Sequence, residues 1–143
     1  MDKVYVVFWT QGGNTGLMAQ AVGDGITEAG KEPVFLQPME ANVADLAAAS
    51  AFALGCPAMG AEVLEETEME PFVAELESQV AGKTIALFGS YGWGDGQWMR
   101  DWTERMTAAG ATVVGGEGLI AHETPDEEAI AKCKELGKAV ASV

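Results

Sequence analysis

Short apolar runs alternate with stretches of helical periodicity along the chain, and no other feature of the sequence constrains its fold as strongly. The apolar runs are typical of strands buried in a sheet, and they fall at residues 4–8, 33–36, 51–55, 84–88 and 112–114, the last resuming at 118–120. Apolar residues also recur at helical spacing around residues 18–29, 43–49, 69–80, 99–109 and 125–141. This alternation predicts a doubly wound α/β fold of three layers, with a five-stranded parallel sheet between helices.

The net charge of the chain limits its partners. Its 143 residues fit a single domain over 1–143, and 22 Asp and Glu against 8 Lys and Arg give a formal net charge of −14. No Lys or Arg lies between Lys31 and Lys83, whereas glutamates gather within residues 62–77. Such a chain repels nucleic acid and anionic membranes and attracts a basic docking surface. A surface that only keeps the protein in solution would have the same composition.

Location and oligomeric state are also suggested by the sequence. The apolar runs are too short to cross a bilayer and the chain begins without a basic leader, so we expect a cytoplasmic protein with no membrane insertion. Cys56 and Cys133 lack metal-site spacing and are expected to be small buried residues. His122 follows the last predicted strand and is expected on the surface. Nothing in the sequence demands more than a monomer.

Three loops, each following a strand, are expected to form one site. The carboxyl ends of parallel strands meet at one edge of the sheet, and open α/β folds bind their ligands beyond that edge. The loops are Thr10–Thr15, Cys56–Glu62 and Gly89–Gly96.

The first loop predicts an anion site. It leads from a strand into a helix, so backbone N–H groups and the positive end of the helix converge on one point, which suits a phosphate. Thr10–Thr15 has no Lys before a Ser or Thr and no Gly-x-Gly-x-x-Gly pattern, so it matches neither nucleotide-binding motif. A tight strand–helix turn without a ligand is the alternative for this loop taken alone.

The third loop predicts a slot for a flat ring. Glycines surround Tyr91 and Trp93, so these side chains are expected to have little core to enter. Trp93 suits stacking on a planar ring, and Met59 of the second loop suits the opposite face of that ring. Alternatively, Trp93 and Met59 only cap the end of the core. Together the loops fit a ligand that joins a phosphate, a polar spacer and a planar heterocycle.

These segments resemble the flavodoxin family, in its short-chain form, from the first strand to the last helix. The residues that carry the resemblance are Trp9–Thr15, Leu54–Gly60, Glu62 and Leu87–Gly94. The resemblance implies the flavodoxin-like strand order 2-1-3-4-5. It also implies a low-potential one-electron carrier that binds FMN non-covalently and shuttles electrons between redox enzymes.

The resemblance implies a role for several residues at the FMN phosphate. Thr10, Asn14 and Thr15 would contact the phosphate, helped by Ser90. The family commonly reads Ser/Thr-x-Thr-Gly-x-Thr in this loop, and Gly12 stands where the middle Thr is expected. One hydroxyl contact, worth roughly 1 kcal/mol, is therefore missing. We expect weaker phosphate binding, with the backbone amides still in place.

The resemblance also implies how the isoalloxazine ring is held. Trp93 and Met59 would cover its two faces, and Glu62 would accept a hydrogen bond from the ring N3–H. Backbone groups of Met59, Gly60, Gly92 and Trp93 would contact the ring edge. The complete set of predicted cofactor-binding residues is Thr10, Gln11, Gly12, Gly13, Asn14, Thr15, Pro57, Ala58, Met59, Gly60, Glu62, Ser90, Tyr91, Gly92, Trp93 and Gly94.

Two expectations concern the redox steps. One-electron reduction puts a proton on flavin N5, and the carbonyl of the Met59–Gly60 peptide is expected to turn toward it, since Gly60 tolerates the positive φ of such a turn. A second electron would place an anion within a protein of net charge −14, so the second step is expected to be strongly reducing.

An enzyme on the same fold, an FMN-dependent NAD(P)H:quinone-type reductase, is the alternative. It would need an open substrate site on the flavin, whereas Trp93 and Met59 are expected to cover both faces. A receiver-type signalling module without FMN would need clustered acids after the first strand, and Thr10–Thr15 contains none. No catalytic nucleophile or base is evident. We therefore expect an electron-transfer protein that works with redox partners bearing basic docking surfaces.

Overall fold

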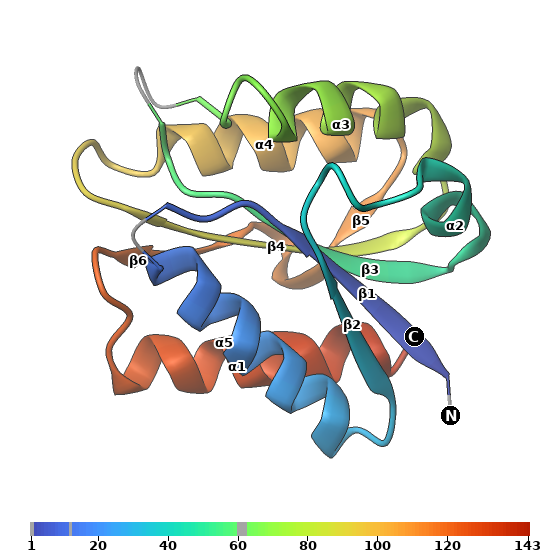
Figure 1. Ribbon diagram of the computed structural model, residues 1–143, viewed down its shortest axis with the longest axis horizontal. Coiled ribbons are helices and arrows are strands. Elements are labelled where there is room, and N and C mark those ends of the chain that lie inside the picture. Colours follow the sequence, from blue (N-terminus) through green and yellow to red (C-terminus); the bar gives the residue numbers. More distant parts are fainter. Residues whose placement is uncertain (1, 12, 60–62) are drawn as a thin grey trace.

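The computed structural model describes residues 2–11, 13–59 and 63–143, and its centre is a parallel sheet (Figure 1). The strands pair in the order β2-β1-β3-β4-β5, with β6 also paired to β4, and every pairing is parallel. The predicted strand order is therefore confirmed. The strands are β1 (Lys3–Phe8), β2 (Glu32–Leu36), β3 (Ala51–Gly55), β4 (Thr84–Tyr91), β5 (Thr112–Val113) and β6 (Leu119–His122).

The fifth position of the sheet is shared by two short strands. β5 pairs with the start of β4 and β6 with its end, as in Phe88↔Leu119. Between them lies the 3-10 turn η2 (Val114–Gly116), where Gly115 and Gly116 have φ of 78° and 83°. Backbone at positive φ cannot stay extended, so the chain leaves the sheet edge and rejoins it further along. The predicted pause in this strand is confirmed.

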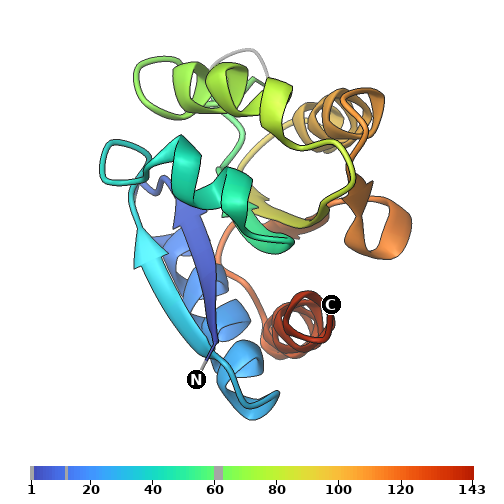
Figure 2. The same cartoon turned by 90° about the vertical axis from the view of Figure 1, so that its right-hand side faces the viewer.

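The helices form a layer on each face of the sheet (Figure 2). α1 and α5 cover one face, and α2, α3 and α4 cover the other. The third helix is shorter than predicted, because it ends at Leu76 and continues as a 3-10 turn, η1 (Glu77–Gln79). The helices are α1 (Asn14–Glu28), α2 (Val43–Ala48), α3 (Met69–Leu76), α4 (Gln97–Ala108) and α5 (Glu127–Ala141).

Helices α1 and α5 approach each other closely through glycines. A Cβ at Gly25 would lie 2.0 Å from the carbonyl oxygen of Lys134, and one at Gly137 would lie 2.0 Å from that of Val22. Only glycine permits this approach of two backbones. The contact holds the second half of α1 against α5.

Apolar side chains fill both faces of the sheet. One cluster includes Phe52, Leu87 and Trp102, and the other includes Met18 and Val22. Cys56 and Cys133 are buried free thiols, as predicted, and burial raises the pKa of each to about 12.

No helix within the described parts of the chain is long and apolar enough to cross a membrane.

Candidate functional site

The three predicted loops lie together at the carboxyl edge of the sheet, at the left of Figure 1. Backbone hydrogen bonds continue the pairing of β1, β3 and β4 past the ends of the strands, so the loops leave the sheet side by side. These bonds run from the N–H of Trp9 to the carbonyl of Gly55 (3.0 Å), from Cys56 to Phe88 (3.1 Å) and from Ala58 to Ser90 (3.0 Å). The predicted convergence of the loops is confirmed.

The first loop presents hydrogen-bond donors at the start of α1. Gly13 precedes the helix with φ 91°, and no atom lies within 4 Å of the position a Cβ would take there. Thr10 Oγ1 accepts the N–H of Gly16 (3.2 Å), which leaves the hydroxyl hydrogen of Thr10 for another acceptor. No hydrogen bond among the described residues uses the N–H groups of Asn14 and Thr15. Gln11 is exposed, and Gly12 lies outside the described residues.

Two buried hydroxyl groups hold the end of this loop against the sheet. Thr15 and Ser90 are 1% and 6% exposed, and their hydroxyls hydrogen bond to each other (3.1 Å). The N–H of Ser90 also donates to Thr15 Oγ1 (3.3 Å). The pair joins the start of α1 to β4. Ser90 and Tyr91 belong to β4 itself, so the prediction that the third loop begins at Gly89 is wrong by three residues.

A fourth loop, between β6 and α5, also reaches the site. The hydroxyl of Thr124 donates to Asn14 Oδ1 (3.2 Å), Nε2–H of His122 donates to the carbonyl of Gly92 (3.2 Å), and the N–H of Glu123 donates to the carbonyl of Tyr91 (2.7 Å). His122 is exposed, as predicted. The signal for this loop was present in the sequence, because it too follows a strand of a parallel sheet.

The two aromatic residues expected in the third loop differ in packing. Trp93 is 64% exposed, as its glycine-rich surroundings predict. Tyr91 is half-buried, with its ring centroid 5.6 Å from that of Trp98 and 5.0 Å from that of His122. The expectation that Tyr91 has little core to enter is therefore wrong, because its place in β4 directs it onto the start of α4. Gly94 adopts φ 84°.

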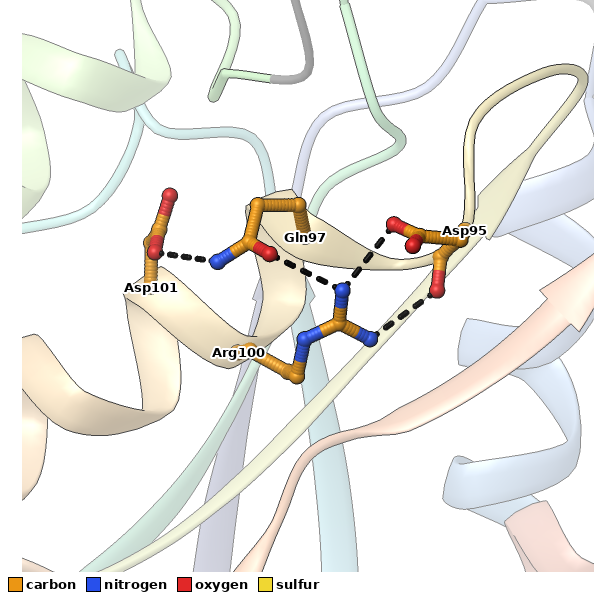
Figure 3. A network of polar contacts seen from close by, with 4 residues as sticks. All are labelled: Asp95, Gln97, Arg100 and Asp101. Carbon is orange, nitrogen blue, oxygen red and sulfur yellow. Dashed lines mark hydrogen bonds and ion pairs between the residues drawn. The ribbon is translucent and has the colours of Figure 1, made fainter.

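The far end of the third loop is held by Arg100 of α4. Figure 3 shows its guanidinium group between Asp95 and Gln97. Nη1 donates to the carbonyl of Asp95 (3.0 Å), and Nη2 donates to Asp95 Oδ1 and to Gln97 Oε1 (both 2.9 Å). Gln97 in turn donates to Asp101 Oδ1 (2.8 Å). These contacts are exposed, so the loop is held by polar groups in contact with water.

An antiparallel bridge joins Met59 and Val63 in the second loop. The N–H of each donates to the carbonyl of the other, both at 2.9 Å. The Met59 carbonyl is therefore engaged within the loop in this structure, and the turn at Gly60 that would direct it toward flavin N5 lies outside the described residues. Of the other predicted residues, Pro57 is buried and Ala58 is half-buried, while Gly60 and Glu62 lie outside the described residues.

Glu65 anchors the chain shortly after this bridge. Its buried carboxylate accepts the N–H groups of Thr67 (2.8 Å), Glu68 (2.6 Å) and Met69 (3.1 Å), as well as the Thr67 hydroxyl. Burial raises the pKa of Glu65, but these hydrogen bonds outweigh it and hold the pKa below its ordinary value. In the sequence, Glu65 is one of the acids gathered within residues 62–77. The signal of its role is a carboxylate placed shortly before a helix.

The described residues fit a ligand of the predicted kind. Thr10, Asn14 and the N–H groups at the start of α1 are neutral donors for a phosphate. Trp93 offers an exposed ring face, and no atom lies within 4 Å of a Cβ position at Gly92. The donor set and the aromatic surface together match the two ends of FMN.

Comparison with known proteins identifies the family. The flavodoxin family profile matches residues 6–137. The chain is 46% identical to a flavodoxin from Clostridium beijerinckii, over 96% of this chain and 99% of that protein. It is 43% identical to one from Megasphaera elsdenii, over 96% and 98%. The solution structure of two-electron reduced Megasphaera elsdenii flavodoxin has a TM-score of 0.86 at 40% identity, over 98% and 99% of the two chains. The chain therefore belongs to the flavodoxin family and is an FMN-binding electron carrier rather than an enzyme.

Proposed function

We propose that residues 1–143 act as one domain that carries single electrons at low potential, with FMN bound across the three loops. The observation that carries this proposal is the pairing of a donor-lined helix start with an exposed tryptophan at one edge of the sheet. Bound FMN supplies the one-electron chemistry. The chain supplies the binding site and the surrounding charge.

At the phosphate end, Thr10 and Asn14 donate to phosphate oxygens together with the backbone N–H groups around Gly13. Thr15 and Ser90 keep the loop in place through their buried hydroxyl pair and complete the phosphate contacts. Gln11 and Gly12 belong to the same loop. Neutral donors at a helix start suit a phosphate without a cation.

At the ring end, Trp93 and Met59 cover the two faces of the isoalloxazine. Tyr91, Gly92 and Gly94 shape the loop beside Trp93, and Pro57, Ala58, Gly60 and Glu62 belong to the second loop of the site. A ring covered on both faces exposes mainly its edge, which suits electron transfer and leaves no place for a substrate. The low potential follows from a net charge of −14, since a further anion in this environment is unfavourable.

Stepwise reduction of the FMN-loaded protein, followed by visible absorption, tests the carrier function. We expect two resolved one-electron steps, with the second midpoint potential below that of free FMN. A single two-electron step with rapid reoxidation by a quinone would contradict the proposal.

We further propose that basic redox partners dock at the ring end. The glutamates within residues 62–77 are not all available, because Glu65 accepts N–H groups at the start of α3 and Arg105 pairs with Glu70 and Glu77. Glu66 and Glu123 remain exposed beside the ring loops and are candidates for docking. Charge-steered contacts of this kind suit a transient partner.

Electron transfer to cytochrome c, a basic one-electron acceptor, tests this docking surface. The double variant Glu66→Gln/Glu123→Gln should slow the second-order rate at low ionic strength by about threefold or more. The matched control, Asp2→Asn/Glu32→Gln, removes the same charge at the opposite edge of the sheet and should have a smaller effect. Equal effects would indicate that only the net charge matters.

We also propose that the protein works as a monomer in the cytoplasm. Its two buried thiols suit a reducing compartment. Sedimentation equilibrium of the FMN-loaded protein tests the monomer, and a mass of twice 15.0 kDa would contradict it.

A further inference from the structure

A residue of the fourth loop contacts the three-loop site and can influence FMN binding without touching the ligand. We propose that Thr124 positions the Asn14 side chain, so that the Asn14 amide N–H groups face the FMN phosphate. The proposal rests on the proposed function, in which Asn14 is a phosphate contact. Thr124 itself is a positioning residue and does not touch the ligand.

Thr124 is held in place from both sides of its loop. On the β6 side, the N–H of Glu123 donates to the carbonyl of Tyr91 (2.7 Å), and His122 pairs in register with Tyr91. On the α5 side, Asp126 caps the helix by accepting the N–H of Ala129 (2.8 Å). Glu123 adopts φ 56°, which is unusual for a residue with a side chain, so the turn that presents Thr124 is well defined.

The hydrogen bond holds the Asn14 amide in one orientation in this structure. Asparagine has one carbonyl oxygen, which accepts, and one NH₂ group, which donates twice. The Thr124 hydroxyl donates to Oδ1 of Asn14 (3.2 Å), so the NH₂ group points away from Thr124. The flipped amide would direct its oxygen toward an anion at the start of α1 and repel it. Thr124 therefore anchors the Asn14 side chain beside the start of α1 in an orientation that a phosphate accepts.

The orientation of one amide matters because this loop has few side-chain donors. Thr10–Thr15 contains no Lys or Arg, and Gly12 supplies no hydroxyl. One of the two hydroxyl hydrogens of Thr15 and Ser90 is used in the hydrogen bond between them, so the pair offers one donor. A correctly oriented Asn14 also loses less rotamer freedom when FMN binds, since the Thr124 contact has restricted it beforehand.

The test compares FMN with riboflavin, which has the same ring and no phosphate. Dissociation constants for the full chain, from which FMN has been removed, are measured by quenching of flavin fluorescence. Thr124→Val keeps the shape of the side chain and removes its hydroxyl, and it should weaken FMN binding about three- to tenfold while leaving riboflavin binding unchanged. Thr124→Ser keeps the hydroxyl group, and this variant should bind FMN as the wild type does. Thr124 is exposed, so the fold should survive both changes.

The double variant Thr124→Val/Asn14→Ala shows whether Thr124 acts through Asn14. With Asn14 truncated, Thr124→Val should have no further effect on FMN binding. A loss that persists in this background, an equal loss for riboflavin, or no loss in Thr124→Val would each overturn the inference. Asn14→Ala alone tests the proposed function: unchanged FMN binding there would remove Asn14 from the phosphate site and the inference with it. Weakened binding in Asn14→Ala together with wild-type binding in Thr124→Val would overturn the inference alone.

Discussion

At the phosphate end of the site, side chains from distant parts of the sequence hydrogen bond to one another. At the ring end, the side chain of Trp93 is exposed to solvent. Thr15 and Ser90 form a buried pair, and Thr124 reaches Asn14 across the sequence. Trp93 lies on a glycine-rich loop with 64% of its surface in contact with water.

The difference indicates how far each end of the site is organised before the ligand binds. The phosphate end is organised by the protein itself, so its residues contribute to the stability of the fold as well as to binding. The ring end gains its packing partner only when a flat ring lies against Trp93. Substitutions at the two ends should therefore separate in two measurements: the stability of the FMN-free protein, and the preference for FMN over riboflavin.

The largest effect is expected at Trp93. Trp93→Ala removes about 100 Å² of apolar contact with the ring together with aromatic stacking, about 3 kcal/mol in total, so FMN and riboflavin should both bind about 100-fold more weakly. The free energy of unfolding of the FMN-free protein should change by less than about 0.5 kcal/mol, because the side chain is exposed. Fluorescence titration and urea denaturation measure the two quantities. Trp93→Phe keeps an aromatic face and should lose less flavin affinity. If Trp93→Ala weakened FMN binding but not riboflavin binding, the proposed difference between the two ends of the site would be wrong.

Thr15→Val should show the opposite pattern. It leaves the buried N–H and hydroxyl of Ser90 without their partner, so the FMN-free protein should lose about 2 kcal/mol of unfolding free energy. FMN binding should weaken more than riboflavin binding. Urea denaturation and the two flavin titrations check this, and Thr15→Ser, which keeps the hydroxyl, serves as the control. A fully stable Thr15→Val protein would show that the phosphate end is not organised in advance.

A substitution at Glu65 tests whether the segment that follows the second loop is also held by contacts within the FMN-free protein. Glu65→Gln replaces the charged acceptor of several N–H groups and should lower the unfolding free energy at pH 7 by about 1 to 2 kcal/mol. The pKa of Glu65 is lowered by folding, so its stabilisation is complete above the ordinary value of 4.5 and is lost as the pH falls below it.

The difference between wild type and Glu65→Gln should therefore shrink when denaturation is repeated at pH values below 4.5. Glu66→Gln, an exposed neighbour, should cost less than about 0.5 kcal/mol at either pH. A difference that stays constant with pH would rule out the ionised carboxylate as the cause.

The smallest effect is expected at Arg100. Its contacts with Asp95 and Gln97 are exposed, and such pairs are worth about 0.5 kcal/mol. Arg100→Gln should weaken FMN and riboflavin alike, by about twofold at low salt and by less at high salt. Titrations at two ionic strengths check this. Lys132→Gln, which breaks an exposed pair with Glu128 on α5, should leave both affinities unchanged.

Much of the fold and part of the site could be predicted from local patterns. The strand Ala51–Gly55 is observed as predicted, and the pause in the fifth strand coincides with Gly115 and Gly116. Tyr91 was misjudged because neighbouring glycines suggested an open loop, whereas pairing with β6 extends β4 to this residue. Glu65 was misjudged because charge counts do not distinguish a carboxylate in water from one that receives buried N–H groups.

The sequence by itself determined the alternation of strands and helices, the order in which the loops arise and the residue types at the start of α1 and around Trp93. These follow from periodicity and local backbone preference, which act between near neighbours in the chain. Only the tertiary structure decided that Thr15 meets Ser90, that Thr124 meets Asn14 and that Tyr91 packs between Trp98 and His122. Those contacts join residues far apart in sequence, and they form only because a parallel sheet brings the carboxyl ends of its strands to one edge.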